Sequence, residues 1–195
     1  LKGLALGLAG TGLGASALLA GEGKPRPSAS TIIDTHVHFY DPTRPQGVSW
    51  PPKNDPVLYR AVLPKDYAAL PKPQPVPGAV VVEASSLLED NQWILDLAAR
   101  EPFITGFVGN LPVGTEEFSG HLKRFSANPL FRGLRLQAGR VKQHRDEPGF
   151  LADLQRLADR DRSLDLVGGP ELLEFIPKLA AAVPSVMGQA YPVKP

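Results

Sequence analysis

The sequence predicts an α/β fold in which helices cover a parallel sheet, and three observations indicate it. Short runs rich in β-branched residues alternate five times with segments of helical period. The expected strands are apolar on both faces, as buried strands of a parallel sheet are. The 195 residues, 43% hydrophobic and 21% charged, have the composition of a globular domain. This alternation is typical both of an open doubly wound sheet and of the front part of a (β/α)8 barrel.

Each element is placed by its local pattern. Strands are expected at residues 31–39, 79–85, 104–111, 131–137 and 164–168, where short apolar runs occur. Helices are expected at residues 87–100, 116–127, 150–161 and 171–183. The proline-rich segment 40–78 interrupts the alternation, and we expect a long ordered loop there with one helical turn near residues 65–70. Loops of this length in compact domains are usually lids or walls of sites.

The first thirty residues have the layout of an export signal and linker. Gly3 to Ala20 carries no charge, Lys2 precedes it, and a polar segment with prolines follows. Several glycines weaken this stretch as a membrane helix, so we expect no stable membrane span. The prediction is an exported protein, periplasmic or extracytoplasmic, with the fold in residues 31–186 and a divergent tail at 187–195.

Charge and cysteine content exclude several classes of function. The formal net charge of +1 provides no field that would attract nucleic acid or an acidic membrane surface. The chain has no cysteine, which excludes a thiol nucleophile, a cysteine zinc site and an iron–sulfur cluster. A metal site would therefore use His, Asp or Glu. We expect a small-molecule substrate and no nucleic-acid partner.

A His-x-His pair ends the first expected strand. Residues two apart in a strand point to the same face, so His36 and His38 can direct both imidazoles at one point. Two imidazoles on a rigid strand form half of a site for zinc or a similar ion. The alternative is that both rings are satisfied by local hydrogen bonds.

Three further candidates lie at the carboxyl ends of later strands. Glu83 follows an apolar run, where burial raises the pKa of a carboxyl, and it suits general-base work or metal binding. Arg135 is expected to bind a substrate carboxylate or ester oxygen, whereas Arg132, three residues earlier, would face away in a regular strand. Asn110 is expected either to donate a hydrogen bond to the substrate or to cap a loop.

The remaining candidates carry weaker signals. His144 lies in the basic segment 139–145, which reads as a loop after the fourth strand and is close enough to reach a substrate. Basic side chains in that segment attract an anionic ligand or are simply solvated. His121 lies within an expected helix and is interpreted as a solvated side chain.

Taken together, these motifs resemble those of the amidohydrolase-related TIM-barrel family, lactonase-like branch. The resemblance is carried by TIIDTHVHFYDP at 31–42, the Trp50-Pro51 pair, VVVEA at 80–84 and FRGLR at 131–135. It implies an α/β fold, an incomplete (β/α)8 TIM-type barrel with about five βα units. It also implies that His36 and His38 bind a divalent metal, with zinc expected, or act directly on the substrate without a metal, and that Arg135 anchors the substrate.

The family pattern also contains parts that this sequence lacks. The family continues into a strand that ends in Asp-His and later supplies an aspartate that activates water, whereas here the last histidine is His144 and the last acidic residue is Glu174. The resemblance therefore predicts a C-terminally truncated member with impaired activity. It also predicts an open sheet edge that permits self-association.

Three functional hypotheses remain. The first is an exported hydrolase that opens a lactone or similar cyclic ester by water attack, with Glu83 as a catalytic group. The second is a non-catalytic secreted remnant that binds a small ligand or nothing. The third is a metal-dependent phosphoesterase, which Arg135 and the Trp50-Pro51 segment disfavour.

Overall fold

The computed structural model describes residues 32–184, which form a five-stranded parallel sheet with helices between the strands. The strands are β1 (Ile33–Val37), β2 (Gly78–Val82), β3 (Ile104–Gly109), β4 (Phe131–Gln137) and β5 (Ser163–Val167). They lie side by side in chain order. A doubly wound sheet reverses its strand order at a switch point, and this sheet does not. Successive parallel strands in unbroken order are the arrangement of a barrel wall.

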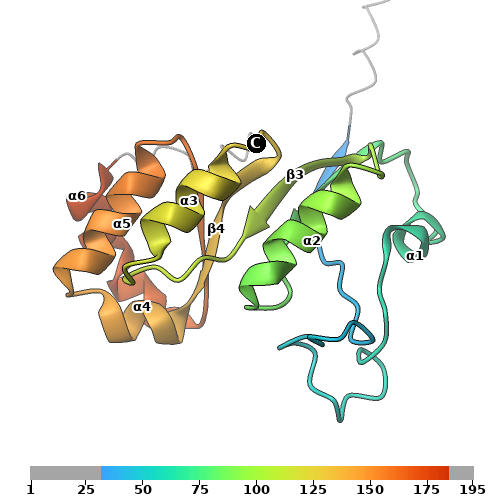
Figure 1. Ribbon diagram of the computed structural model, residues 1–195, viewed down its shortest axis with the longest axis horizontal. Helices are drawn as coiled ribbons and strands as arrows, with labels where there is room; N and C mark the ends of the chain where they lie inside the picture. The colour runs from blue at the N-terminus through green and yellow to red at the C-terminus, as the bar shows by residue number, and fades with distance from the viewer. Residues whose placement is uncertain (1–31, 185–195) are drawn as a thin grey trace, which may run out of the picture. The chain divides into compact units, whose positions relative to one another are not determined.

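Helices follow the strands as the alternation predicts. They are α1 (Pro64–Ala68), α2 (Leu88–Ala98), α3 (Phe118–Ser126), α4 (Ala138–His144), α5 (Pro148–Ala158), the 3₁₀ helix η1 (Pro170–Glu174) and α6 (Ile176–Ala182). In Figure 1, α2 lies against β3 and α3 lies beside α5. None of the helices within residues 32–184 combines the length and apolarity that a membrane span requires.

Two helical predictions need correction. Residues 139–145, expected as a basic loop, are largely helix α4, which begins directly after β4. The single helix expected at 171–183 is two helices that meet at Phe175. Pro177 lies in the first turn of α6 and has no backbone N–H to donate to a preceding turn, so a new helix begins there. The predicted export signal and the predicted tail lie outside the described residues.

The core lies between the helices and one face of the sheet. Five phenylalanines that are almost fully buried form its centre, namely Phe107, Phe118, Phe125, Phe131 and Phe150. Strand residues of the other parity point to the opposite, inner face. On β4 and β5 the core side includes Leu134 and Leu164, which are register partners, so the next pair, Arg135 and Asp165, points inward.

The long segment between β1 and β2 is ordered by a buried ion pair and a serine cluster. Arg44 Nη2 donates to Asp90 Oδ1 on α2 at 2.7 Å, and the Arg44 guanidinium lies 4.3 Å from the centre of the Trp93 ring. Farther along, Ser49 exchanges hydrogen bonds with Ser85 and Ser86 in the β2–α2 loop. The segment is thus fixed to the carboxyl end of β2, where it forms a wall of the site.

Candidate active site

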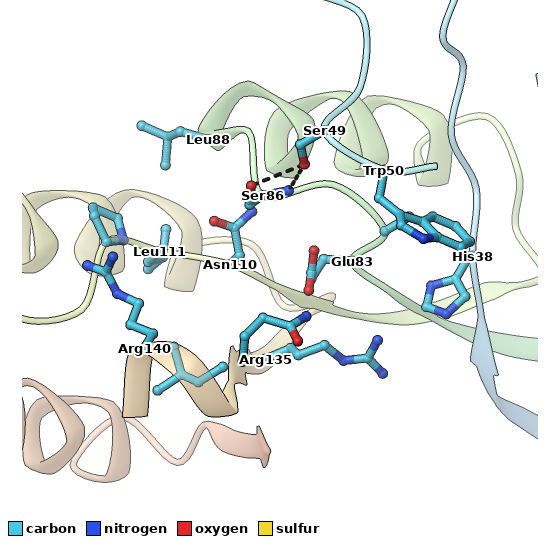
Figure 2. A pocket seen from close by; sticks show the side chains of 14 residues that line it. His38, Ser49, Trp50, Glu83, Ser86, Leu88, Asn110, Leu111, Arg135 and Arg140 are labelled. Carbon is cyan, nitrogen blue, oxygen red and sulfur yellow. Dashed lines mark hydrogen bonds between the residues drawn. The ribbon is translucent and has the colours of Figure 1, made fainter. Parts of the chain in front are cut away.

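A cavity of about 790 Å³ opens at the carboxyl ends of the strands. Four of the six predicted site residues line it: His38, Glu83, Asn110 and Arg135. Each follows or ends a different strand from β1 to β4, so the parallel sheet brings them to one edge. Figure 2 shows Trp50 against His38 on one side of the cavity, Arg140 on the opposite side and Glu83 between them.

His38 has one nitrogen bound and one free. Its Nδ1 lies 2.9 Å from the Val82 carbonyl oxygen. A carbonyl only accepts, so Nδ1 carries the proton and Nε2 keeps its lone pair. Burial lowers the pKa of His38 more than the hydrogen bond to Val82 raises it, and the positive charge of Arg135 adds to the lowering, so the neutral ring is favoured. A neutral ring with a free Nε2 can accept a proton or a hydrogen bond, but it cannot polarise a carbonyl by donation.

His36 is engaged by Arg135. The guanidinium Nη2 lies 2.8 Å from His36 Nε2 and can only donate, so this nitrogen is unprotonated and its lone pair is used. The two imidazole rings of the pair lie nearly perpendicular, 5.0 Å apart between centres. Asp34 does not orient either ring, because its carboxylate accepts from the His36 backbone N–H and from the Tyr67 hydroxyl.

Glu83 lies just past β2 and is partly buried in the cavity wall. Burial raises the pKa of its carboxyl above the ordinary 4.5, and the charge of Arg135 offsets part of that rise. A carboxylate with a raised pKa is a stronger base once ionised. Burial thus shifts the pKa of the Glu83 carboxyl upward, as the apolar run before it predicts.

Asn110 caps a loop, which was the alternative prediction for it. Its Nδ2 donates to the carbonyl oxygens of Ser85 and Leu87, so both amide hydrogens are used. The side-chain oxygen is the atom that remains for a ligand. His144 does not line the cavity in the described structure, because its Nδ1 pairs with Glu147 at 3.0 Å and its ring stacks on Phe150.

Two charged residues at the site are not among the six predicted site residues, although Arg140 belongs to the basic segment 139–145, which is expected to attract an anionic ligand or to be solvated. Arg140 on α4 lines the cavity, with Nη2 donating to the Val113 carbonyl at 2.7 Å and its buried Nε left without a protein partner. Asp165 on β5 lies beside Arg135 in register, and burial raises the pKa of its carboxyl against the opposing charge of Arg135. In the sequence, an acidic residue between Leu164 and Leu166 in an expected strand was the feature that could have marked Asp165 as a site residue.

The described residues do not form a complete metal site. No group of three or more His, Cys, Asp or Glu side chains within residues 32–184 is placed to hold an ion. Zinc usually takes three or four protein ligands. Of the two imidazoles, one has its Nε2 occupied by a guanidinium. The donor set present here therefore does not fit a bound zinc ion without rearrangement.

The sequence profile of the amidohydrolase family, Amidohydro_2, matches residues 33–189. The chain belongs to the amidohydrolase family. This amidohydrolase is 27% identical over 154 residues to the L-fucono-1,5-lactonase of Burkholderia ambifaria, an alignment that covers 78% of this chain and 53% of the relative.

Solved structures show the same fold. An amidohydrolase from Burkholderia multivorans with bound zinc matches with a TM-score of 0.69 and 22% identity, covering 80% of this chain and 55% of the other. A probable 2-pyrone-4,6-dicarboxylic acid hydrolase from Acinetobacter baumannii with citric acid bound matches with a TM-score of 0.60 and 18% identity, covering 77% and 54%. The chain spans about half the length of these relatives. Its five strands are accordingly an incomplete TIM-type barrel, as predicted.

Proposed function

We propose that this amidohydrolase opens a lactone or similar cyclic ester by water attack in the cavity at the carboxyl ends of β1 to β4. The observation that carries the proposal is the convergence of a base, a neutral imidazole and a buried guanidinium in one cavity, provided by Glu83, His38 and Arg135. The similarity to an L-fucono-1,5-lactonase supports the lactone as the substrate class.

Glu83 is the proposed proton acceptor. Its raised pKa makes its carboxylate a stronger base than an ordinary glutamate, while His38 Nε2 is free to accept a hydrogen bond from the second O–H of the attacking water. Water adds to the ring carbonyl carbon as Glu83 takes its proton. The ring C–O bond then breaks, and the departing alkoxide takes the proton from Glu83, which leaves a hydroxy acid and restores the carboxylate.

Arg135 and Arg140 favour a substrate that carries a carboxylate. Both side chains line the cavity, and a guanidinium carries several N–H donors that can bind an anionic ligand. Arg135 lies nearer the proposed base and suits the oxygen on which charge develops during attack. Arg140, on the far side of the cavity, suits a substituent of the ring.

The role of zinc remains a prediction for His36 and His38. The zinc ion belongs to the Burkholderia multivorans structure. Here the lone pair of His36 Nε2 is used by Arg135, so the proposed reaction is assigned to side chains alone. Zinc titration of the purified chain tests the prediction.

A panel of five- and six-membered sugar-acid lactones tests the proposal. We expect the purified chain to hydrolyse at least one member faster than buffer alone and to bind its hydroxy-acid product by calorimetry. Glu83→Gln should slow the hydrolysis by about 10²- to 10⁴-fold and leave product binding in place, whereas the same change at Glu89, an exposed residue on α2, should alter neither. A chain that hydrolyses no lactone but binds the product supports the non-catalytic ligand-binding alternative. A chain that does neither contradicts the proposed hydrolysis and leaves the non-catalytic remnant that binds nothing.

A further inference from the structure

The two histidines of the His-x-His pair are both fixed with the proton on Nδ1, but only one of them has a free lone pair. His38 donates from Nδ1 to the Val82 carbonyl and leaves Nε2 toward the cavity. His36 accepts the Arg135 guanidinium at Nε2, 2.8 Å away. The His-x-His pair therefore offers a cation a single free nitrogen, Nε2 of His38. The spacing of the two histidines alone would place two imidazoles on the same face of the strand.

The guanidinium occupies the position of a metal ion with respect to His36. A divalent ion binds an imidazole through the same unprotonated lone pair, at about 2.0–2.1 Å for zinc. It cannot share that lone pair with an N–H donor, and the like charge beside it raises the cost of binding. Arg135 is only 9% exposed, and it lies within strand β4 between Leu134 and Leu136. It cannot simply turn out into solvent.

We propose that the Arg135 guanidinium and a divalent metal ion bind His36 Nε2 in mutually exclusive states, and that Arg135 is the cation that holds His36 when no metal is bound. In the metal-free state the guanidinium of Arg135 thus supplies the positive charge beside His36. This inference concerns metal binding alone and does not depend on whether the chain hydrolyses a lactone.

Zinc titration of the purified 195-residue chain tests the proposal, with calorimetry as the readout. Arg135→Gln should bind zinc at least about tenfold more tightly than the wild type, since a like charge is removed and a ligand nitrogen is freed. The matched control is Arg140→Gln, which removes the same charge from the same cavity. Arg140 donates to the Val113 carbonyl and not to a histidine, so this variant frees no imidazole nitrogen. Its zinc affinity should stay within about twofold of the wild type, because no ligand is freed.

A double variant identifies the ligand. Arg135→Gln combined with His36→Gln should lose the gain in zinc affinity. The proposal is overturned if Arg135→Gln binds zinc no better than the wild type, if Arg140→Gln gains as much, or if the double variant keeps the gain. Circular dichroism and thermal melting show whether each variant is folded before it is titrated.

Nitrogen NMR of the wild-type histidines provides a second test that needs no variant. We expect both rings as the Nδ1–H tautomer before metal is added. At the lowest zinc concentrations the Nε2 resonance of His38 should shift while that of His36 stays unchanged. Simultaneous shifts of both Nε2 resonances at those concentrations would overturn the proposal even if Arg135→Gln did not fold.

Discussion

The guanidinium of Arg135 on β4 lies 2.8 Å from the imidazole Nε2 of His36 on β1. Two strands separate β4 from β1 in the sheet, so in a flat sheet the two backbones would be roughly 14 Å apart. The contact therefore reflects the curvature of the sheet toward its inner face. It also joins the His-x-His pair to the predicted substrate anchor, two features that lie 99 positions apart in the sequence.

The pH dependence of hydrolysis is expected to report Glu83. The carboxyl must be ionised to take a proton from water, and burial raises its pKa above 4.5. Activity should therefore rise with pH along an acid limb centred above that value. Glu83→Gln should lower kcat by about 10²- to 10⁴-fold and remove the limb. An unchanged acid limb in the variant would show that another group titrates.

Asp165→Asn is expected to raise the melting temperature at pH 7. Burial raises the pKa of Asp165 above 3.8, so the folded chain holds this proton more tightly than the unfolded chain does. The carboxyl thus favours folding below pH 3.8, and this contribution is lost as pH rises through the folded pKa. The melting temperatures of variant and wild type should converge below that pH. A variant that is less stable at pH 7 would mean that attraction to Arg135 outweighs burial.

The buried pair between Arg44 and Asp90 is expected to stabilise the loop that carries Trp50. Both side chains are about nine-tenths buried, and Arg44 also lies over the Trp93 ring. Arg44→Met should lower the free energy of unfolding by about 3 kcal/mol, because it leaves the Asp90 carboxylate buried without its partner. Denaturant melts of the two single variants and of the double variant Arg44→Met with Asp90→Leu measure the coupling. Purely additive losses would show that the pair contributes no interaction energy.

Two glycines are expected to respond to alanine in opposite ways. A Cβ at Gly133 on β4 would collide with the Ser163 backbone on β5, so Gly133→Ala should destabilise the chain by about 1–3 kcal/mol. Gly120 within α3 has open space around the same position, and Gly120→Ala should stabilise the helix by up to about 1 kcal/mol. The free energies of unfolding of the two variants, measured by urea denaturation, test both predictions. A neutral Gly133→Ala would contradict the close approach of β4 and β5.

The outer strands are expected to make the chain associate with itself. Among the described strands, β1 and β5 each pair with a single neighbour, and unpaired strand edges favour association. Light scattering after gel filtration should show a mass that rises with concentration. Thr35→Lys, on the exposed part of β1, should reduce the effect. A monodisperse monomer at every concentration would contradict this prediction.

Much of the fold was predictable because strand and helix periods differ clearly in this sequence. The strand at residues 131–137 has the predicted bounds, since it lies between the helix expected at 116–127 and the basic segment 139–145 that was expected as a loop. The ends of the other strands differ by a few residues because the hydrogen-bond pairing stops before the apolar run does. Helix α4 was missed because its single buried residue, Val141, leaves almost no amphipathic pattern.

The site was predictable as far as the carboxyl ends of parallel strands define it. His38, Glu83, Asn110 and Arg135 share the cavity because each lies near or just past the carboxyl end of a strand. Sequence spacing could not show that Arg135 would take the lone pair of His36, since that contact depends on the curvature of the sheet. Export from the cytoplasm remains a prediction from the composition of residues 1–30.

The proposed substrate of this cavity is a lactone that carries a carboxylate. The most direct test compares kcat/KM for a carboxylated lactone and for its uncharged methyl ester, in the wild type and in Arg135→Gln. We expect the wild type to prefer the acid, and we expect Arg135→Gln to lose about 10²- to 10³-fold of its kcat/KM for both the acid and the ester, because Arg135 acts on the ring carbonyl oxygen that both share. A wild type that hydrolyses neither lactone, or an Arg135→Gln variant with unchanged kcat/KM for the acid, would contradict this proposal.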